Sequence, residues 1–331
     1  MLFSLARQAG MSRLADLTGL DTVGIPVYSA IRPLGRSLSS AQGKGFTSEL
    51  AMLSALGETV EVWRMEHLAD PECIETLQIM NLFTEKSLSK NHTYLAEISL
   101  DLRSLHSAMD KPRKNSNGVG SSWDQYEAMS HAIYELIERK SIDYWRTIPA
   151  QQRIYHLVDQ ALLKDINPEL SNLPCKLAAS NVDLALWDIT MPGSFPCFYA
   201  VIGNQYSEFF PQLAEGSACH PNPLVAIQKA VLEAIQSRLT IISGSRDDLP
   251  LSFYSQYTST SFERVPVPQG THMPSLSIIK ENPISQIRKI CIDQNYSLDL
   301  MNCLILTHGS TDYLSIKLDH PNFLTPSRKL L

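Results

Sequence analysis

The stretch DQYEAMSHAIYELIERKSIDYWR, residues 124–146, has the periodicity of an amphipathic α-helix. With Glu127 as the origin and 100° per residue, its apolar residues cover roughly 100° to 280°. Glu138 then falls at about 20° and Glu135 at about 80°. These carboxylates therefore lie beside the apolar face rather than opposite it, at the edge of a core, where a cleft would form.

Two further segments predict helices with a polar stripe. Residues 47–67 place Ser54, Glu58 and Glu61 at i, i+4 and i+7, which is one face of a helix. Neither glutamate has a lysine or arginine four residues later, so the usual neutralisation within a helix is absent.

The third segment, residues 223–243, carries Lys229, Glu233, Gln236 and Thr240 on one stripe. Clustered carboxylates with few cations between them require a bound cation. Hard oxygen ligands suit Mg²⁺, and a Mg²⁺ cluster usually accompanies a polyphosphate. The alternative is that the glutamates occupy solvated helix faces, with local partners four residues away: Arg139 for Glu135 and Lys229 for Glu233.

A glycine-rich segment, SSAQGKGFT at residues 39–47, precedes the first of these helices. Gly43, Lys44 and Gly45 offer backbone N–H groups, an ammonium and a helix N-terminus, all suited to anions. The segment does not match G-x-x-x-x-G-K-[ST], and alone it could be a simple turn. The residues by themselves thus indicate a Mg²⁺–nucleotide enzyme with an unusual site.

Shorter patterns complete a prediction of a mixed α/β (α+β) fold in a single domain, residues 1–331. Residues 24–31 and 196–203 read as strands, while 112–122 and 191–194 read as loops. The helical and β-like segments interleave without a regular βαβ rhythm, and residues 245–285 give the weakest pattern.

Composition excludes several classes of protein. The 331 residues are 44% hydrophobic and 19% charged, with a net charge of −6, which does not indicate nucleic-acid binding. No apolar run is long enough to cross a membrane, and the N-terminal run is too short for a secretion signal. The six cysteines form no C-x-x-C pair, which predicts reduced thiols in a cytoplasmic protein.

Taken in order, three of these segments resemble the YcaO family. RPLGRSLSSAQGKGFTSELAMLSALGETVE (32–61), SNGVGSSWDQYEAMSHAIYELIER (116–139) and AVLEAIQSRLTIISGSRDD (230–248) are similar to its ordered sequence blocks. The resemblance covers roughly residues 12–250, with 251–331 as the C-terminal part of the same domain. The opening GMSRLADLTGLDTVGIPVYSAIRP (10–33) resembles the subgroup that works with TfuA-type partner proteins.

The resemblance implies an enzyme that binds ATP and Mg²⁺ and phosphorylates a backbone amide oxygen of a ribosomally made peptide, as in bacteriocin biosynthesis. A nucleophile then attacks the amide carbon. Sulfide gives a thioamide, a Cys, Ser or Thr side chain gives an azoline, and an amine gives an amidine. Homodimerisation, and a separate TfuA-like or leader-binding partner, are expected from the resemblance only.

The resemblance also assigns site residues by motif. The metal and phosphate ligands it implies are Glu58, Glu61, Glu127, Glu135, Glu138 and Glu233. The nucleotide contacts it implies are Lys44, Ser54, Arg139, Gln236 and Arg246, and Arg238 lies in the same block.

The chain departs from the family pattern at several positions. Val62 stands where many members have arginine, Trp123 where an asparagine contacts the nucleotide, and Lys229 where an arginine is usual. Residues 320–331, HPNFLTPSRKLL, lack the P-x-P-x-P ending of many azoline-forming members.

These features order three hypotheses. The first is thioamide formation with a TfuA-like partner, because the N-terminal segment resembles that subgroup and the proline ending is absent. The second is the same activation chemistry leading to an azoline or an amidine. The third, motivated by Trp123 and Val62, is a non-catalytic nucleotide-binding scaffold in a peptide-modifying complex.

Overall fold

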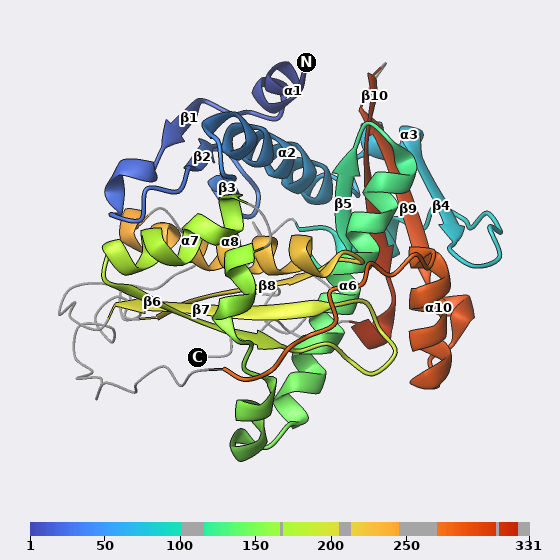
Figure 1. Cartoon of the computed structure of the whole chain (residues 1–331). Helices are drawn as coiled ribbons and strands as arrows, with labels where there is room; N and C mark the ends of the chain where they lie inside the picture. The colour runs from blue at the N-terminus through green and yellow to red at the C-terminus, as the bar shows by residue number, and fades with distance from the viewer. Residues whose placement is uncertain (101–115, 166–167, 205–212, 245–269, 309–310, 324–331) are drawn as a thin grey trace.

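A computed structural model of the chain describes residues 1–100, 116–165, 168–204, 213–244, 270–308 and 311–323 (Figure 1). Within these residues the fold is mixed α/β and contains antiparallel sheets flanked by helices, which confirms the predicted fold class. None of the described helices combines the length and the apolar character needed to cross a lipid bilayer.

The first sheet lies near the N-terminus and has the order β1-β2-β3. Its strands are β1 (Arg13–Asp16), β2 (Val27–Ile31) and β3 (Ser40–Lys44), preceded by α1 (Leu2–Gln8). Helix α2 (Ser48–Glu66) follows β3 and packs on β3 and β2.

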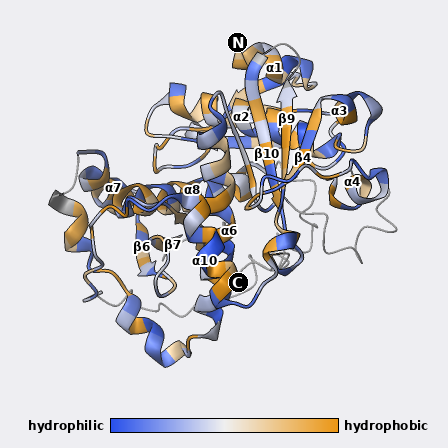
Figure 2. Ribbon diagram, turned by 90° about the vertical axis from the view of Figure 1, so that its right-hand side faces the viewer, coloured by the Kyte–Doolittle hydropathy of each residue, from blue (hydrophilic) through white to orange (hydrophobic). Residues whose placement is uncertain are grey.

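The second sheet has the order β4-β9-β10-β5, so strands from the end of the chain separate two earlier strands. Its members are β4 (Leu77–Asn81), β9 (Asn302–His308), β10 (Thr311–Asp319) and β5 (Val119–Ser122). The four-residue strand β5 lies at an edge, and α6 (Gln125–Thr147) follows it. Strand β9 is hydrophobic along much of its length (Figure 2).

The third sheet has the order β6-β7-β8 and leads into the third predicted helix. Its strands are β6 (Val182–Asp188), β7 (Cys197–Asn204) and β8 (Leu213–Cys219), followed by α8 (Pro223–Ser243). Helix α8 packs on β8 and β7, while α6 contacts β5 and β10 of the second sheet and also β8 of the third. Helix α6 therefore connects these two sheets (Figure 1).

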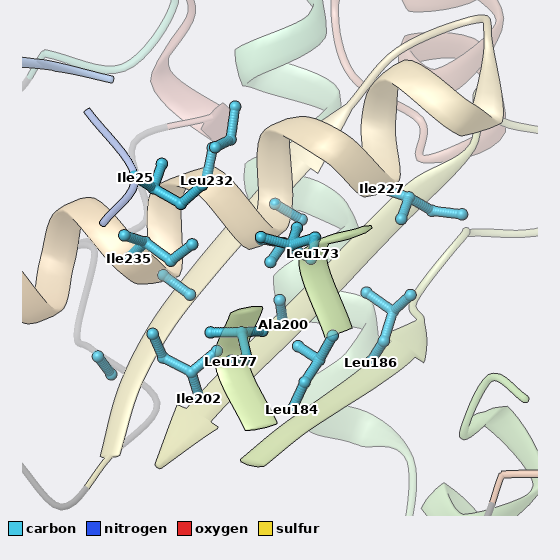
Figure 3. Close-up of a cluster of buried hydrophobic side chains, with 14 of the residues drawn as sticks. Ile25, Leu173, Leu177, Leu184, Leu186, Ala200, Ile202, Ile227, Leu232 and Ile235 are labelled. Atoms are coloured by element: carbon cyan, nitrogen blue, oxygen red, sulfur yellow. The ribbon is translucent and has the colours of Figure 1, made fainter. Parts of the chain in front are cut away.

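Shorter helices complete the described fold. They are η1 (Thr18–Leu20), α3 (Pro71–Thr76), α4 (His92–Ile98), η2 (Ala150–His156), η3 (Gln160–Asp165), α7 (Pro168–Ala179), α10 (Pro283–Asp293), η4 (Leu298–Leu300) and η5 (Pro321–Phe323). A large core cluster lies between α7, α8 and the third sheet, where Leu173, Leu184 and Ile227 are labelled in Figure 3.

A glycine brings each long helix into close contact with the strand before it. A Cβ atom on Gly43 of β3 would lie 2.0 Å from Ala55 N of α2. The equivalent atom on Gly120 of β5 would lie 2.2 Å from Ala128 O of α6. Gly216 of β8 makes the same approach to Ala230 of α8, at 2.3 Å. Only glycine permits these distances, so backbone packing fixes the position of each long helix.

The predicted elements agree with the structure except around β5. The three long helices lie within one residue of their predicted bounds, and residues 191–194 form the predicted loop. The prediction of a loop across 112–122 is wrong for Val119–Ser122, which pair with β10. Gly43 and Lys44 end strand β3 rather than forming a separate turn.

Candidate functional site

Each of the three long helices begins at a capping residue. The side chains of Thr47, Asp124 and Asn222 accept backbone N–H hydrogen bonds from the first turns of α2, α6 and α8. Such polar caps define where a helix starts. The cap fixes where each helix starts, and the glycine contact fixes how closely the helix packs on the strand before it.

Glu135 lies at the centre of the contacts on α6. Its Oε2 atom accepts a hydrogen bond of 3.1 Å from the backbone N–H of Val119 in β5. Its Oε1 atom lies 3.3 Å from Nη2 of Arg139, one turn later. Nη1 of Arg139 lies 3.4 Å from Oε1 of Glu138. One guanidinium therefore contacts both carboxylates of the AIYELIER segment.

Glu138 is buried between α6 and the third sheet. The Ser217 hydroxyl of β8 donates a hydrogen bond of 2.7 Å to its Oε1 atom. Burial raises the pKa of Glu138 to about 7; Arg139 opposes this increase and Glu233 adds to it. A second cation near Glu138 would stabilise its charged form.

Helix α8 adds a carboxylate, Glu233, and an ammonium group, Lys229, and the end of β3 adds a second ammonium group, Lys44. Nζ of Lys44, at the end of β3, lies 3.4 Å from Oε2 of Glu233. Burial and the neighbouring Lys44 lower the pKa of the half-buried Lys229. Gln236 donates a hydrogen bond of 3.4 Å to the backbone oxygen of Gln42. Lys44 and Glu233 thus form an ion pair, and Gln236 lies three residues further along α8.

Helix α2 contributes a carboxylate that lies close to Glu135. Burial raises the pKa of Glu61 to about 8, and repulsion from Glu135 and Glu58 adds to this increase. Contacts with Ser121 and Lys317 oppose it. Like-charged carboxylates held this close favour a cation between them.

Three predicted residues are less tightly connected to this group. Glu127 is exposed in the first turn of α6, where its Oε2 atom accepts a hydrogen bond of 2.8 Å from Ser122. Ser54 is exposed on α2. Arg246 lies outside the described residues.

Arg238 forms an ion pair with a residue outside the predicted site. Its Nε atom lies 2.9 Å from Oδ2 of Asp21, and both side chains are buried. This ion pair ties α8 to the segment after η1.

The three departures from the family pattern have different surroundings. Val62 is half-buried on α2 and Lys229 half-buried on α8. The Trp123 ring is 41% exposed and lies edge-on to Tyr313 of β10, with the ring centroids 4.8 Å apart. Trp123 therefore presents a partly exposed aromatic ring at this position rather than an amide.

Several polar residues of the site were missed by sequence reasoning. Ser121 and Lys317 adjoin Glu61, and Ser217 contacts Glu138. The alternation of polar and apolar residues in YLSIKLD (313–319) could have indicated that Ser315 and Lys317 share a face. No comparable signal marked Ser217.

The donor set fits Mg²⁺ only in part. Among the described residues, no three His, Cys, Asp or Glu side chains converge closely enough to hold a metal ion. Oε1 of Gln236 and Nε of Arg139 are buried and have no hydrogen-bond partner in the described part of the chain. Such orphaned atoms, next to carboxylates with raised pKa values, indicate that a polar ligand would complete the site.

Comparison with known proteins identifies the family. A model of the YcaO cyclodehydratase family, described as ATP- and Mg²⁺-binding, matches residues 86–297. This chain belongs to the YcaO family. The family description names the two ligands, ATP and Mg²⁺, that the sequence predicts.

A curated relative supports this assignment. The "Uncharacterized protein in tfuA 3'region" of Rhizobium leguminosarum bv. trifolii is 30% identical to this YcaO chain over 287 residues. The alignment covers 76% of the chain and 67% of the relative. The chain spans 61% to 67% of the length of the first curated relatives it matches.

Two solved structures share the fold of this YcaO chain. YcaO from Methanopyrus kandleri, bound with AMPPCP and Mg²⁺, aligns with a TM-score of 0.63 and 19% identity, covering 96% of the chain and 86% of its own length. The E. coli microcin synthetase McbBCD complex with pro-MccB17 bound contains a chain that aligns with a TM-score of 0.61 and 15% identity, covering 93% and 87%.

Proposed function

We propose that this YcaO protein uses Mg²⁺ and ATP to phosphorylate a backbone amide oxygen of a peptide, and that the activated amide becomes a thioamide. The convergence of Glu135, Glu138 and Glu233 with Arg139 and Lys44 carries this proposal. Anionic and cationic groups meet there. Phosphoryl transfer mainly requires positioning and charge neutralisation, which such a site provides.

The carboxylates would hold Mg²⁺ together with the nucleotide. The candidates are Glu58 and Glu61 on α2, Glu135 and Glu138 on α6, and Glu233 on α8. Because the described side chains form no complete metal site, phosphate oxygens would supply the remaining ligands. This division is typical of Mg²⁺, which uses one or two carboxylates together with substrate phosphates.

Cationic and amide groups would bind the phosphates and the rest of the nucleotide. Arg139 and Lys44 lie among the carboxylates, where they can offset phosphate charge. Gln236 has a buried acceptor available for a nucleotide donor. Bound ATP supplies the phosphoryl group that makes the amide oxygen a leaving group.

With sulfide as the nucleophile, every bond formed and broken in the reaction is accounted for. The amide oxygen forms a bond to the γ-phosphorus of ATP, and ADP leaves. Sulfide then attacks the amide carbon, phosphate departs with the oxygen, and loss of a proton leaves a thioamide. The relative in the tfuA 3′ region supports a TfuA-like partner, which would help to deliver sulfide or the peptide.

Azoline or amidine formation is the alternative reaction. The family description as cyclodehydratases favours it, and the McbBCD complex shows that a chain of this fold can work with partner subunits on a peptide. In this reaction a side chain or an amine attacks the same activated carbon. The net loss is one water, with no gain of sulfur.

The deciding experiment is an intact-mass measurement. The chain, a TfuA-like partner, sulfide, ATP and Mg²⁺ are incubated with a candidate precursor peptide. Replacement of one oxygen by sulfur supports the thioamide proposal, whereas loss of water supports the alternative. If neither change occurs with partner and peptide present, a non-catalytic scaffold becomes the better explanation, consistent with Trp123 in place of the usual asparagine.

The substitution Glu135→Gln tests whether the glutamate site is catalytic. The amide keeps the size of the side chain but removes the charge next to Glu61 and Arg139. We expect peptide-dependent ATP turnover to fall by about 100-fold or more. The matched control Glu75→Gln changes an exposed glutamate on α3 and should leave turnover unchanged. Equal turnover in both variants would remove Glu135 from the site.

A further inference from the structure

Lys317 is a fully buried lysine in β10, with 1% of its surface exposed. Its Nζ atom donates a hydrogen bond of 2.9 Å to the backbone oxygen of Asn117. It lies directly opposite Val119 of β5 in the sheet register. Lys317 also lies beyond residues 86–297, the segment that matches the family model.

Acidic groups from three elements act electrostatically on this ammonium. Glu135 reaches the neighbourhood from α6 through its hydrogen bond with Val119 N. Glu61 of α2 and Asp319 of β10 itself interact with the ammonium electrostatically. Burial lowers the pKa of Lys317, while Asp319, Glu135 and Glu61 oppose this. A buried charge without such partners would be strongly destabilising.

We propose that Lys317 is a resident counter-ion of Glu61 and Glu135, which offsets the charge of the two carboxylates in the metal-free protein and weakens Mg²⁺ binding. The inference rests on the proposed function, because it takes these carboxylates as part of the Mg²⁺–nucleotide site. Lys317 acts through them and is a positioning residue.

The proposal predicts that Lys317 makes Mg²⁺ binding less favourable. In the metal-free protein, the ammonium offsets the repulsion between the carboxylates. In the loaded protein, it repels a nearby divalent cation. Loss of Lys317 therefore destabilises the metal-free state and removes a repulsion from the loaded state. Both effects make Mg²⁺–nucleotide binding more favourable in the variant.

The test compares Lys317→Met with the wild-type chain in the absence of peptide. Thermal unfolding is measured in chelator and with Mg²⁺ plus a non-hydrolysable ATP analogue, and Mg²⁺ is titrated calorimetrically at fixed analogue concentration. We expect Lys317→Met to bind Mg²⁺ about tenfold more tightly and to gain more in Tm on loading. Leu318→Ala is the matched control, because it weakens β10 from the opposite face without a change of charge.

The control should lose the same Tm in both conditions and keep the wild-type Mg²⁺ midpoint. A Lys317→Met midpoint within twofold of wild type, with an equal gain in Tm, would overturn the inference while leaving the proposed function intact. A wild-type chain that binds no Mg²⁺–nucleotide would overturn both. If Lys317→Met does not fold, Glu61→Gln is added: recovery of folding supports the counter-ion pairing, and failure to recover contradicts it.

Discussion

His320, just after β10, is 1% exposed, and both of its ring nitrogens are engaged. The backbone N–H of Asn322 donates to Nδ1 at 3.1 Å, and Nε2 lies 3.0 Å from the backbone oxygen of Ser297. The first contact requires an unprotonated Nδ1 and the second a proton on Nε2. The ring is therefore held in its neutral form. Burial lowers its pKa below the ordinary value.

This histidine predicts a loss of stability in mild acid. The unfolded chain takes up the proton more readily than the folded chain. The contribution of His320 is therefore fully present above its ordinary pKa of about 6.5, and is lost as the pH falls toward the lower folded pKa. Tm measured between pH 7.5 and pH 5 should fall less for His320→Gln than for wild type. Parallel curves for the two proteins would contradict the assignment.

A buried ion pair predicts a large loss of stability when one of its two residues is replaced. Nη2 of Arg32 lies 2.5 Å from Oε2 of Glu66, and the two side chains are 4% and 0% exposed. Nε of Arg32 also donates to the backbone oxygen of Ala9. Arg32→Met leaves the Glu66 charge buried, which should lower the free energy of unfolding by about 3–5 kcal/mol in urea denaturation.

Arg36→Met provides a comparison within the same loop. Arg36 pairs with Asp70, but the two side chains are 18% and 36% exposed. Water can solvate the remaining carboxylate, so we expect a loss of about 1 kcal/mol. Equal losses for Arg32→Met and Arg36→Met would show that burial does not set the difference.

At the scale of elements, the contact between a glycine and a helix can be tested directly. A Cβ atom at Gly216 would lie 2.3 Å from both Ala230 O and Ala234 N, and 2.7 Å from the Cβ of Glu233. Gly216→Ala must therefore push α8 away from β8 and move Glu233. We expect a loss of about 1–3 kcal/mol in unfolding free energy, with weaker Mg²⁺–nucleotide binding.

The matched control is Gly57→Ala in the interior of α2. A Cβ atom there meets only the Tyr313 hydroxyl, at 3.5 Å. Alanine is favoured over glycine in a helix by about 1 kcal/mol, so this variant should be neutral or stabilised. Destabilisation by both changes would indicate a general intolerance of alanine at these positions instead of a specific close approach.

The helices could be predicted because their signals are local. Asn222 caps α8, Pro223 is its first residue, and Gly244 follows its end with a φ of 60°. The strand β5 could not be predicted in this way. Its four residues read as a loop, and only pairing with Leu314–Lys317, far along the chain, makes them a strand.

The contacts of the site likewise divide into local ones, which could be predicted, and long-range ones, which could not. Contact between Glu135 and Arg139 follows from their spacing of four residues, and it is the local pairing named in the alternative of solvated helix faces. Helical periodicity also placed Glu138 beside a core. The hydrogen bond of Glu138 with Ser217 and the electrostatic interaction of Glu61 with Lys317 join segments far apart in sequence, and a single sequence contains no measure of that proximity.

At the scale of the whole molecule, burial determines the order in which the thiols react. Cys175 is exposed on α7, and the other five cysteines are buried and unpaired. Burial raises the pKa of the Cys303 thiol to about 12 and that of Cys291 to about 11. Alkylation of the native protein, followed by mass mapping, should modify Cys175 first, because the thiolate is the reactive form. Denatured protein should react at all six, and early modification of Cys303 would contradict this packing.

The order of the second sheet has a consequence for synthesis of the chain. Strands β4 and β5 are made early, but β9 and β10, which lie between them, come only after residue 301. Domains fold as their parts leave the ribosome, and long-range strand pairing is slow. A nascent chain can therefore form the helices that carry Glu61 and Glu135 well before it can join their strands into one sheet. Glu61 and Glu135 can therefore interact with Lys317 of β10 only after translation has passed that strand.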